Sequence, residues 1–306
     1  MGHNKYRQRY CPANAGVAKL GKGAGLRILF LVILGFESLP LHHHVVSFMK
    51  GLAVVTGASG GIGKEIARIL ASEGYDLVIA ARSEGKLREL SEELSSAHHI
   101  SITEVAADLS TEEGRKALFD MTQQTPDILV NNAGFGDYGP FADCPWEKQD
   151  EMIRLNMLAL SHITHHFLPD MISAGSGRIL NVASVAAFEP GPLMSVYYAS
   201  KAYVLSLSEA LTVELKGTGV TVTALCPGPV NTGFSKAANA EDVSLFKKSS
   251  GADAAKVAEF AVRKMHKGKP IAVYGMLFKV SLFFVKILPR ALVRRLIYRI
   301  QKSRTR

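Results

Sequence analysis

Short apolar runs alternate with helical segments between residues 52 and 225, and this alternation restricts the fold more than any other feature of the chain. Helical spacing is clear after the first run, where Ile62, Ile66 and Ile69 recur on one face. Strands that alternate with helices form a parallel sheet covered on both faces. The sequence therefore predicts an α/β fold with a single doubly wound domain over residues 49–275, which binds ligands at the carboxyl ends of its strands. The expected strands are 52–55, 77–80, 100–106, 128–130, 178–182 and 220–225.

A glycine-rich turn, Thr56–Gly63, joins the first expected strand to the first expected helix. Its spaced glycines are Gly57, Gly61 and Gly63. The first permits a tight turn, the second lets the backbone approach a pyrophosphate, and the third lets the helix pack closely. The phosphates then lie at the positive N-terminus of the helix. A turn of this kind between a strand and a helix predicts a dinucleotide-binding site.

The end of the second expected strand indicates which dinucleotide is bound. A site that prefers NAD usually offers a carboxylate there to the ribose 2′-hydroxyl. In this chain the strand ends in Ala80-Ala81-Arg82-Ser83, so that a guanidinium and no acid follows it. Arg82 can pair with a 2′-phosphate through two hydrogen bonds, and Ser83 can add a hydroxyl contact. These residues predict NADP(H) in preference to NAD(H).

A tyrosine and a lysine four residues apart, Tyr197 and Lys201, are the main candidates for catalysis. On a helix the two side chains share one face. A lysine ammonium near a phenol favours the phenolate and lowers the tyrosine pKa from about 10, which makes the phenol a usable acid or base. Ser184 follows an expected strand and can hydrogen-bond the same reacting oxygen. Asn156 is a polar residue among apolar neighbours in the helix expected over 152–167.

Taken in order, these motifs resemble the short-chain dehydrogenase/reductase family, in its main Tyr-x-x-x-Lys type. The resemblance covers residues 50–270 and includes three further motifs. These are Asp108 after the third strand, Asn131-Asn-Ala-Gly134 after the fourth, and Pro227-Gly-Pro-Val-x-Thr232. The resemblance implies a Rossmann-type fold and an enzyme that interconverts a carbonyl and an alcohol by hydride transfer with NAD(P).

The resemblance also implies a role for each matched residue. Tyr197 would be the acid or base, and Lys201 would hold the nicotinamide ribose and lower the tyrosine pKa. Ser184 would orient the carbonyl, Asn156 would hold a water in a proton relay, and Asp108 would contact the adenine. The cofactor-binding set implied in this way is Thr56, Gly57, Ser59, Gly61, Ile62, Gly63, Arg82, Ser83, Asp108, Asn132, Ala133, Gly134, Tyr197, Lys201, Pro227, Gly228, Val230 and Thr232.

The net charge of +9 is unevenly distributed along the chain. Residues 1–48 contain six basic residues and one acidic residue. Residues 49–278 contain 21 basic and 26 acidic residues, and residues 279–306 contain nine basic residues and no acidic one. The body is therefore mildly acidic, and its charge gives no reason to expect nucleic-acid binding. The three cysteines build no disulfide framework, which favours a reducing compartment and a cytoplasmic location.

The last segment, residues 276–306, is first apolar and then basic and amphipathic. The apolar run 276–288 is too short to span a bilayer. Beyond Pro289, at 100° per residue, basic and aliphatic side chains separate onto two faces. Two uses stay open: attachment to an anionic membrane surface, or docking on the body or on a dimer partner. The two faces are Arg290, Arg294, Arg295, Arg299 and Lys302 against Leu292, Val293, Leu296, Ile297 and Ile300.

Residues 1–48 have little periodic pattern and are expected to be disordered or an upstream extension, with Met49 as a natural start. A membrane-contacting segment and a cleaved signal peptide are the alternatives. Histidines occur together at His42–His44 and, at helical spacing, at His162 and His166. Neither group has a carboxylate or cysteine partner at matching spacing, so we expect no metal site.

The function that the sequence favours is an NADP(H)-dependent oxidoreductase that interconverts a carbonyl and an alcohol. Phe135, Tyr138 and Phe141, together with the apolar C-terminus, suggest a lipid-like substrate. The alternative is a non-catalytic dinucleotide-binding regulator or a membrane-recruited scaffold, and the complete Ser/Tyr/Lys set argues against it. We also expect a homo-oligomer. By the resemblance, Ser235–Ser250 would be a mobile substrate lid.

Overall fold

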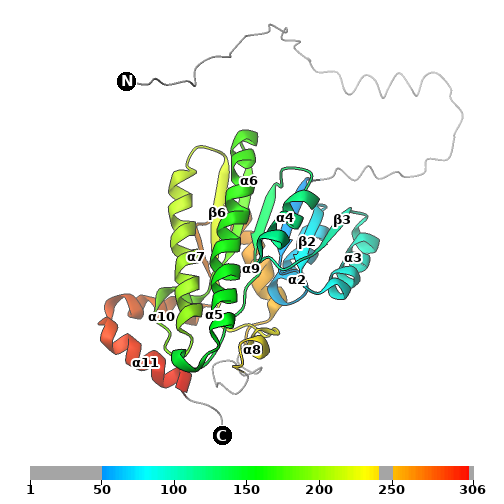
Figure 1. Cartoon of the computed structure of the whole chain (residues 1–306). Helices are drawn as coiled ribbons and strands as arrows, with labels where there is room; N and C mark the ends of the chain where they lie inside the picture. The colour runs from blue at the N-terminus through cyan, green and yellow to red at the C-terminus, as the bar shows by residue number, and fades with distance from the viewer. Residues whose placement is uncertain (1–49, 241–250, 303–306) are drawn as a thin grey trace, which may run out of the picture. The chain divides into compact units, whose positions relative to one another are not determined.

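Seven parallel strands form the centre of the computed structural model, which describes residues 50–240 and 251–302 (Figure 1). Their order across the sheet is β3-β2-β1-β4-β5-β6-β7, and every neighbouring pair is parallel. The predicted doubly wound α/β sheet is thus confirmed. The strands are β1 Leu52–Thr56, β2 Asp76–Ala81, β3 Ile102–Ala106, β4 Ile128–Asn131, β5 Gly177–Val182, β6 Val220–Cys226 and β7 Ile271–Val273.

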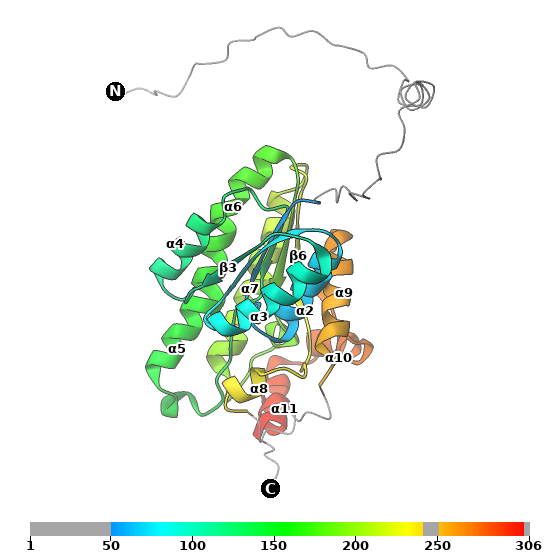
Figure 2. The same ribbon diagram turned by 90° about the vertical axis from the view of Figure 1, so that its right-hand side faces the viewer.

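Helices cover both faces of the sheet (Figures 1 and 2). Ala53 and Val55 of β1 face one layer of the core, which α2, α3 and α9 complete, whereas Val54 faces a second layer built with α4, α6 and α7. All three side chains are fully buried, which explains why the strand is an unbroken apolar run. The helices are α2 Gly61–Ser72, α3 Glu84–His98 and α9 Ala254–His266 on one face, and α4 Glu112–Met121, α6 Leu160–Ala174 and α7 Ser195–Glu214 on the other.

The strand order changes direction between β1 and β4, and this is where the carboxyl ends of the strands leave a crevice. β1 pairs with β2 on one side and with β4 on the other, so the loops after these strands diverge. The turn after β1 and the segment after β4 therefore border the same crevice. The predicted ligand position at the ends of the strands follows from this topology.

Local structure differs from the prediction in two places. The helix predicted over 152–167 consists of three consecutive elements, α5 Trp146–Ile153, the π-helical turn η2 Arg154–Ala159 and α6. Strand β7 was not predicted, because three residues carry too little periodicity to be recognised. The remaining short elements are η1 Phe141–Asp143, η3 Val185–Phe188 and α8 Phe234–Ala237.

Two further helices, α10 Met276–Ile287 and α11 Arg290–Lys302, lie at the end of the sheet where the strands finish (Figures 1 and 2). One side of α11 faces the body through three residues spaced four apart, Val293, Ile297 and Gln301. Val293 and Gln301 are buried, and Ile297 is half-buried. Much of its aliphatic face is therefore exposed. No helix within 50–240 and 251–302 is long and apolar enough to cross a membrane.

Three predictions concern segments that lie partly or wholly outside the described residues. The leader 1–48, with His42–His44, lies outside them, and so does the larger part of the predicted lid. The described part of the lid is Ser235–Ala240.

The histidines of α6 make packing contacts. His162 Nδ1 accepts a hydrogen bond from Arg115 Nε at 3.0 Å. The ring of His166 stacks on Phe119 with 3.8 Å between centroids. Among the residues that the structure describes, no group of three histidine, cysteine or acidic side chains could hold a metal ion.

Candidate active site

The glycine turn places the N-terminus of α2 at the carboxyl end of β1. Gly57 and Gly61 have φ angles of +67° and +56°, in the left-handed region that glycine adopts readily. A Cβ atom on Gly63 would lie 2.3 Å from Asn132 Nδ2 and 2.5 Å from the carbonyl oxygen of Gly57, so a larger residue does not fit. Gly60 caps α2 without a side-chain hydrogen bond, which leaves the first N–H groups of the helix available to an anion.

Asn132 and Thr56 fasten this turn to the end of β4. Asn132 Nδ2 donates to the carbonyl oxygens of Thr56 at 2.9 Å and of Gly57 at 3.1 Å. Thr56 Oγ1 accepts hydrogen bonds from the backbone N–H groups of Asn132 and Ala133, at 3.0 and 3.1 Å. The turn and the strand end are therefore held in one fixed arrangement.

A cationic group of side chains lies after β2. Arg82, Ser83 and Lys86 border one cavity together, and the sequence pattern gave no signal for Lys86. Arg82 Nη1 lies 2.7 Å from Glu151 Oε1 of α5, and 61% of the Arg82 side chain is exposed. Ser83 caps α3 without a side-chain hydrogen bond. Since exposed ion pairs contribute little free energy, an anionic ligand can compete with Glu151 for Arg82.

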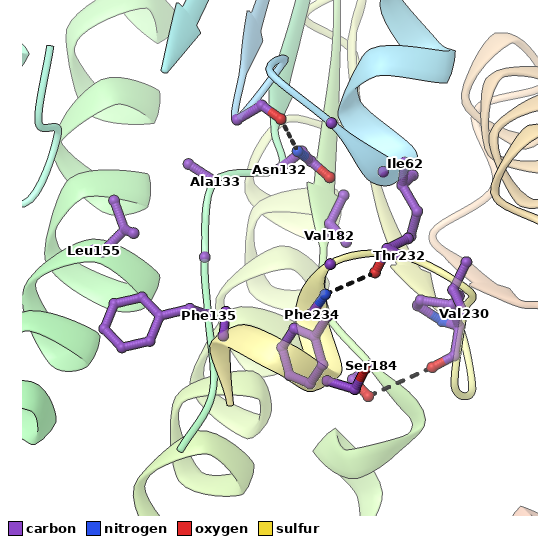
Figure 3. A pocket seen from close by; sticks show the side chains of 18 of the residues that line it. Ile62, Asn132, Ala133, Phe135, Leu155, Val182, Ser184, Val230, Thr232 and Phe234 are labelled. Carbon is purple, nitrogen blue, oxygen red and sulfur yellow. Dashed lines mark hydrogen bonds between the residues drawn. The ribbon is translucent and has the colours of Figure 1, made fainter. Parts of the chain in front are cut away.

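Tyr197, Lys201 and Ser184 line the same cavity. Tyr197 and Lys201 are one turn apart on α7, and Lys201 Nζ donates to the carbonyl oxygen of Val182 at 2.8 Å. Ser184 caps η3 and its Oγ accepts a backbone N–H of that turn at 3.1 Å. Ser184 Oγ also donates to the carbonyl oxygen of Pro227 at 3.4 Å, a weak contact that a substrate oxygen can replace (Figure 3).

Burial dominates the protonation of the two candidates on α7. It raises the pKa of Tyr197 to about 12, although hydrogen bonding to Ser184 opposes the rise. It lowers the pKa of Lys201 to about 8. Burial therefore has the larger effect on the tyrosine pKa here, and the role of Lys201 in lowering it stays a prediction. Desolvation disfavours the charged form of both groups, and Lys201 Nζ is 5.8 Å from the centroid of the phenol ring.

Asn156 supports the cavity from behind without lining it. Its Nδ2 donates to the carbonyl oxygen of Phe135 at 2.9 Å and to Ser200 Oγ at 3.1 Å, and its Oδ1 accepts from Phe135 N at 3.1 Å. These contacts join the segment after β4 to α7. The role in a proton relay stays a prediction.

One cavity of about 540 Å³ unites these elements (Figure 3). Among the predicted site residues, Thr56, Gly63 and Asn156 stand behind its wall as supports. The predicted residues that line it are Gly57, Ser59, Gly61, Ile62, Arg82, Ser83, Asp108, Asn132, Ala133, Gly134, Ser184, Tyr197, Lys201, Pro227, Gly228, Val230 and Thr232.

Sequence reasoning missed an apolar part of the lining, formed by Leu155, Tyr198 and Phe234. The ring of Phe234 lies 5.2 Å from that of Tyr197, centroid to centroid. Figure 3 shows Phe234 near Ser184, in the segment that follows Thr232. The only signal for these residues is their position beside recognised motifs in the sequence or the fold.

Comparison with known proteins agrees with this geometry. The model of the protein family described as short chain dehydrogenase matches residues 51–243 of this chain. The chain belongs to the short-chain dehydrogenase/reductase family. It is therefore an NAD(P)-dependent oxidoreductase, as the resemblance implied.

Relatives of this short-chain dehydrogenase include an uncharacterized oxidoreductase of Staphylococcus epidermidis, 36% identical over 181 residues that make up 59% of this chain and 78% of the relative. A short-chain dehydrogenase from Sphingobium yanoikuyae, solved in complex with NADPH, is 26% identical with a TM-score of 0.69, over 84% of this chain and 98% of its own. One from Burkholderia phymatum, in complex with NAD, is 26% identical with a TM-score of 0.70, over 85% and 98%.

Proposed function

We propose that this short-chain dehydrogenase uses NADP(H) to interconvert a carbonyl and an alcohol on a lipid-like substrate. The observation that carries the proposal is the lining of one cavity by Tyr197, Ser184 and Lys201 together with the glycine turn. A non-catalytic regulator or scaffold has no need of this complete set. The test is NADPH oxidation with a panel of ketones, aldehydes and 3-oxoacyl compounds, and failure to turn over any of them would contradict the proposal.

The chemistry of the side chains suggests how they act. Tyr197 Oη gives a proton to the carbonyl oxygen during reduction and takes one back during oxidation. Its pKa of about 12 keeps the phenol protonated at neutral pH, which is the form that reduction requires. Ser184 Oγ hydrogen-bonds the same oxygen and orients it. When bound, the cofactor supplies or accepts the hydride.

The residues present fit a dinucleotide. A Cβ atom on Gly57 would lie 2.7 Å from Asn132 Nδ2, so glycine lets the turn pack closely on the segment after β4, and the N–H groups at the start of α2 suit a pyrophosphate. By the family resemblance, Asp108 would hold the adenine and the loop 227–232 would hold the nicotinamide. Lys201 would hold the ribose between them.

The preference for NADP(H) rests on Arg82, Ser83 and Lys86. They bring two cations and a hydroxyl to one end of the cavity, where a 2′-phosphate would find charge-assisted hydrogen bonds. Of the two solved relatives above, one carries NADPH and the other NAD, so family membership does not decide the preference. The proposed preference therefore rests on the side chains after β2 of this chain.

The lipid-like substrate is supported by the cluster of apolar side chains around Tyr197. The cluster combines residues from the segment after β4, from α7 and from α8, and most of them are buried. Its members Phe135, Tyr198 and Phe234 line the cavity, and such walls favour an apolar compound with its polar group at the reacting carbon. The cluster includes Phe135, Tyr138, Met152, Met194, Tyr198 and Phe234.

We also propose that α10 and α11 contact an anionic membrane surface. Leu277, Phe283 and Ile287 of α10 are 77%, 61% and 65% exposed, and Leu292 and Leu296 of α11 are 50% and 48% exposed. Segment 276–306 contains no acidic residue, so its charge complements an anionic surface. The sequence left docking on the body and contact with a membrane as alternatives. The two are compatible, because Val293, Ile297 and Gln301 of α11 face the body, whereas Leu292 and Leu296 lie on an exposed part of the same helix.

A cytoplasmic location and a homo-oligomeric assembly complete the proposal. Cys144 and Cys226 are free thiols, as suits a reducing compartment. Leu158, Ile172 and Val213 are 45%, 40% and 74% exposed and offer apolar surface to a second copy. Light scattering of the purified chain measures the assembly, and a monomer at all concentrations would contradict this part.

A further inference from the structure

Gln301, near the end of α11, is fully buried although the helix carries basic side chains on its surface. Two hydrogen bonds hold it. Its Nε2 donates to Tyr198 Oη at 2.6 Å, and its backbone carbonyl oxygen accepts from Tyr138 Oη at 2.8 Å. The partners are more than 100 residues away in sequence, so the end of the described chain is built into the interior of the domain.

Both tyrosines belong to the apolar cluster around the reacting end of the cavity. Tyr198 lines the cavity, and its ring centroid is 6.0 Å from that of Tyr197. Tyr138 comes from the segment after β4 that also contains Phe135. α10 approaches the same region, because a Cβ atom on Gly228 would lie 2.2 Å from Cε2 of Phe278. The C-terminal helices thus support this side of the cavity from behind its lining.

The hydrogen bonds of Gln301 are incomplete. Its Oε1 is buried and has no hydrogen-bond partner among the described residues. Turning the amide by 180° exchanges the two atoms and leaves the nitrogen without a partner instead. A buried polar atom in this condition costs free energy unless a ligand or water satisfies it. The amide therefore keeps one unused polar atom beside the hydroxyl of Tyr198, a residue that lines the cavity, whereas Gln301 itself lies behind the lining.

We propose that Tyr198, positioned by Gln301, forms a polar subsite for a second, uncharged polar group of the substrate, apart from the group that reacts. The proposal rests on the proposed function, since it assigns a substrate class to that same cavity. Tyr198 lines the cavity and makes the direct contact. Gln301 stands behind the lining and holds the Tyr198 hydroxyl in place through its hydrogen bond.

The surroundings of the subsite select an uncharged group. Burial, together with the nearby carboxyl of Glu189, raises the pKa of Tyr198, so its hydroxyl stays protonated. The same burial disfavours any charged ligand. The expected substrates are apolar ketones or alcohols that carry a further hydroxyl or carbonyl group at a distance from the reacting carbon.

The test compares 2-alkanones with hydroxy-2-alkanones of equal chain length, with the hydroxyl at successive positions. We expect kcat/KM with NADPH to favour the hydroxyl compound at one position. In Tyr198→Phe and Gln301→Leu the ratio of the two kcat/KM values falls by about tenfold, the effect of one hydrogen bond. In the double variant the loss is less than additive, because the two residues act on one group.

Tyr298→Phe is the matched control, since Tyr298 lies on the exposed side of the same helix and is 40% exposed. It should leave the preference unchanged. Equal losses for both kinds of ketone in Tyr198→Phe would mean a structural role only, and an unchanged preference would also overturn the proposal. The melting temperature of each variant shows whether α11 remains docked.

The failure of the proposed function is distinguishable from the failure of the subsite. If the wild-type protein oxidises NADPH with none of the ketones, the proposed function fails. Calorimetric titration of the hydroxy-2-alkanones then tests the subsite without turnover. Binding that is weakened about tenfold in Tyr198→Phe supports the subsite, and equal binding to the wild type and this variant, or binding to neither, refutes it.

Discussion

Lys201 Nζ lies 2.8 Å from the carbonyl oxygen of Val182 and donates a hydrogen bond to it. This contact joins α7 to the end of β5 and fixes the turn of the helix that also carries Tyr197. The phenol is therefore presented to the cavity from a helix held at the strand ends. Its buried surroundings raise its pKa to about 12 and keep it protonated over the physiological range.

The variant Tyr197→Phe should lose turnover by about two to four orders of magnitude, because the proton donor to the substrate oxygen is removed. NADPH binding should be kept, since the ring remains in the cavity wall. Steady-state kinetics and fluorescence titration of NADPH measure the two effects. Tyr203→Phe, on a more exposed part of the same helix, is the control and should retain activity. Retained turnover in Tyr197→Phe would refute the assignment.

The variant Arg82→Ala should raise the Michaelis constant for NADPH by about tenfold or more, as expected for the loss of a charge-assisted hydrogen bond, and leave that for NADH nearly unchanged. Glu151→Gln removes the competing carboxylate and should lower the constant for NADPH. Arg88→Ala is a matched control, because this side chain is also 61% exposed and paired with a carboxylate. Equal effects of Arg82→Ala on both cofactors would contradict the predicted preference.

The variant Gly63→Ala should destabilise the fold by about 1–3 kcal/mol and weaken NADPH binding, because the added Cβ atom would collide with Asn132 and with the Gly57 carbonyl. Gly85→Ala is the control. Nothing lies within 4 Å of its added Cβ in α3, so this variant should be neutral or more stable by up to about 1 kcal/mol. Urea denaturation measures both, and equal stability of the two variants would show that the turn tolerates a side chain.

The parts of the fold and site that the sequence predicts are those governed by local chemistry. Buried parallel strands are recognised as continuous apolar runs in the sequence. The turn is recognised from its glycines, because Gly57 and Gly61 have positive φ angles that glycine adopts readily. Seventeen of the predicted site positions line the cavity because the family motifs stand at strand ends. Their chemical roles remain predictions.

The parts that the sequence does not predict depend on contacts between distant segments. Gln301 falls 20° from Arg290 on a helical wheel, on the basic face, and yet it is fully buried. Only its hydrogen bonds to Tyr138 and Tyr198 explain this burial. The raised pKa of Tyr197 has a similar origin, since desolvation by the folded chain outweighs the effect expected from a neighbouring lysine.

The pKa of Glu189 is raised by burial to about 7, from a usual value of 4.5. Between these values the folded state binds more protons than the unfolded state, so the free energy of unfolding falls as the pH rises through this window. Glu189→Gln should match the wild type near pH 4.5 and be more stable by roughly 1–2 kcal/mol near pH 8, less than the full shift implies because the group is partly exposed.

Urea denaturation at several pH values measures this difference between Glu189→Gln and the wild type. Glu92→Gln, on the exposed side of α3, is the control and should show no such pH dependence. A constant difference between Glu189→Gln and the wild type across the window would contradict a buried carboxyl that titrates near pH 7.

Membrane contact through α10 and α11 predicts flotation with vesicles that contain phosphatidylglycerol and little flotation with pure phosphatidylcholine. Each basic residue near an anionic surface contributes about 1 kcal/mol, and salt screens this attraction. Flotation should therefore weaken as salt is added, and the double variant Arg294→Gln/Arg299→Gln should bind less at every salt concentration. Phe283→Ser should weaken binding through lost burial of its side chain, which is 61% exposed in the free protein.

Val213→Ser is the matched control for the apolar part of this contact, because Val213 is 74% exposed on α7, away from both C-terminal helices. It should float like the wild type. Equal flotation with both kinds of vesicle, or no effect of the two C-terminal changes, would contradict the membrane surface as partner. If Phe283→Ser instead converts an oligomer into a monomer without lipid, the exposed face of α10 binds a second copy of the chain.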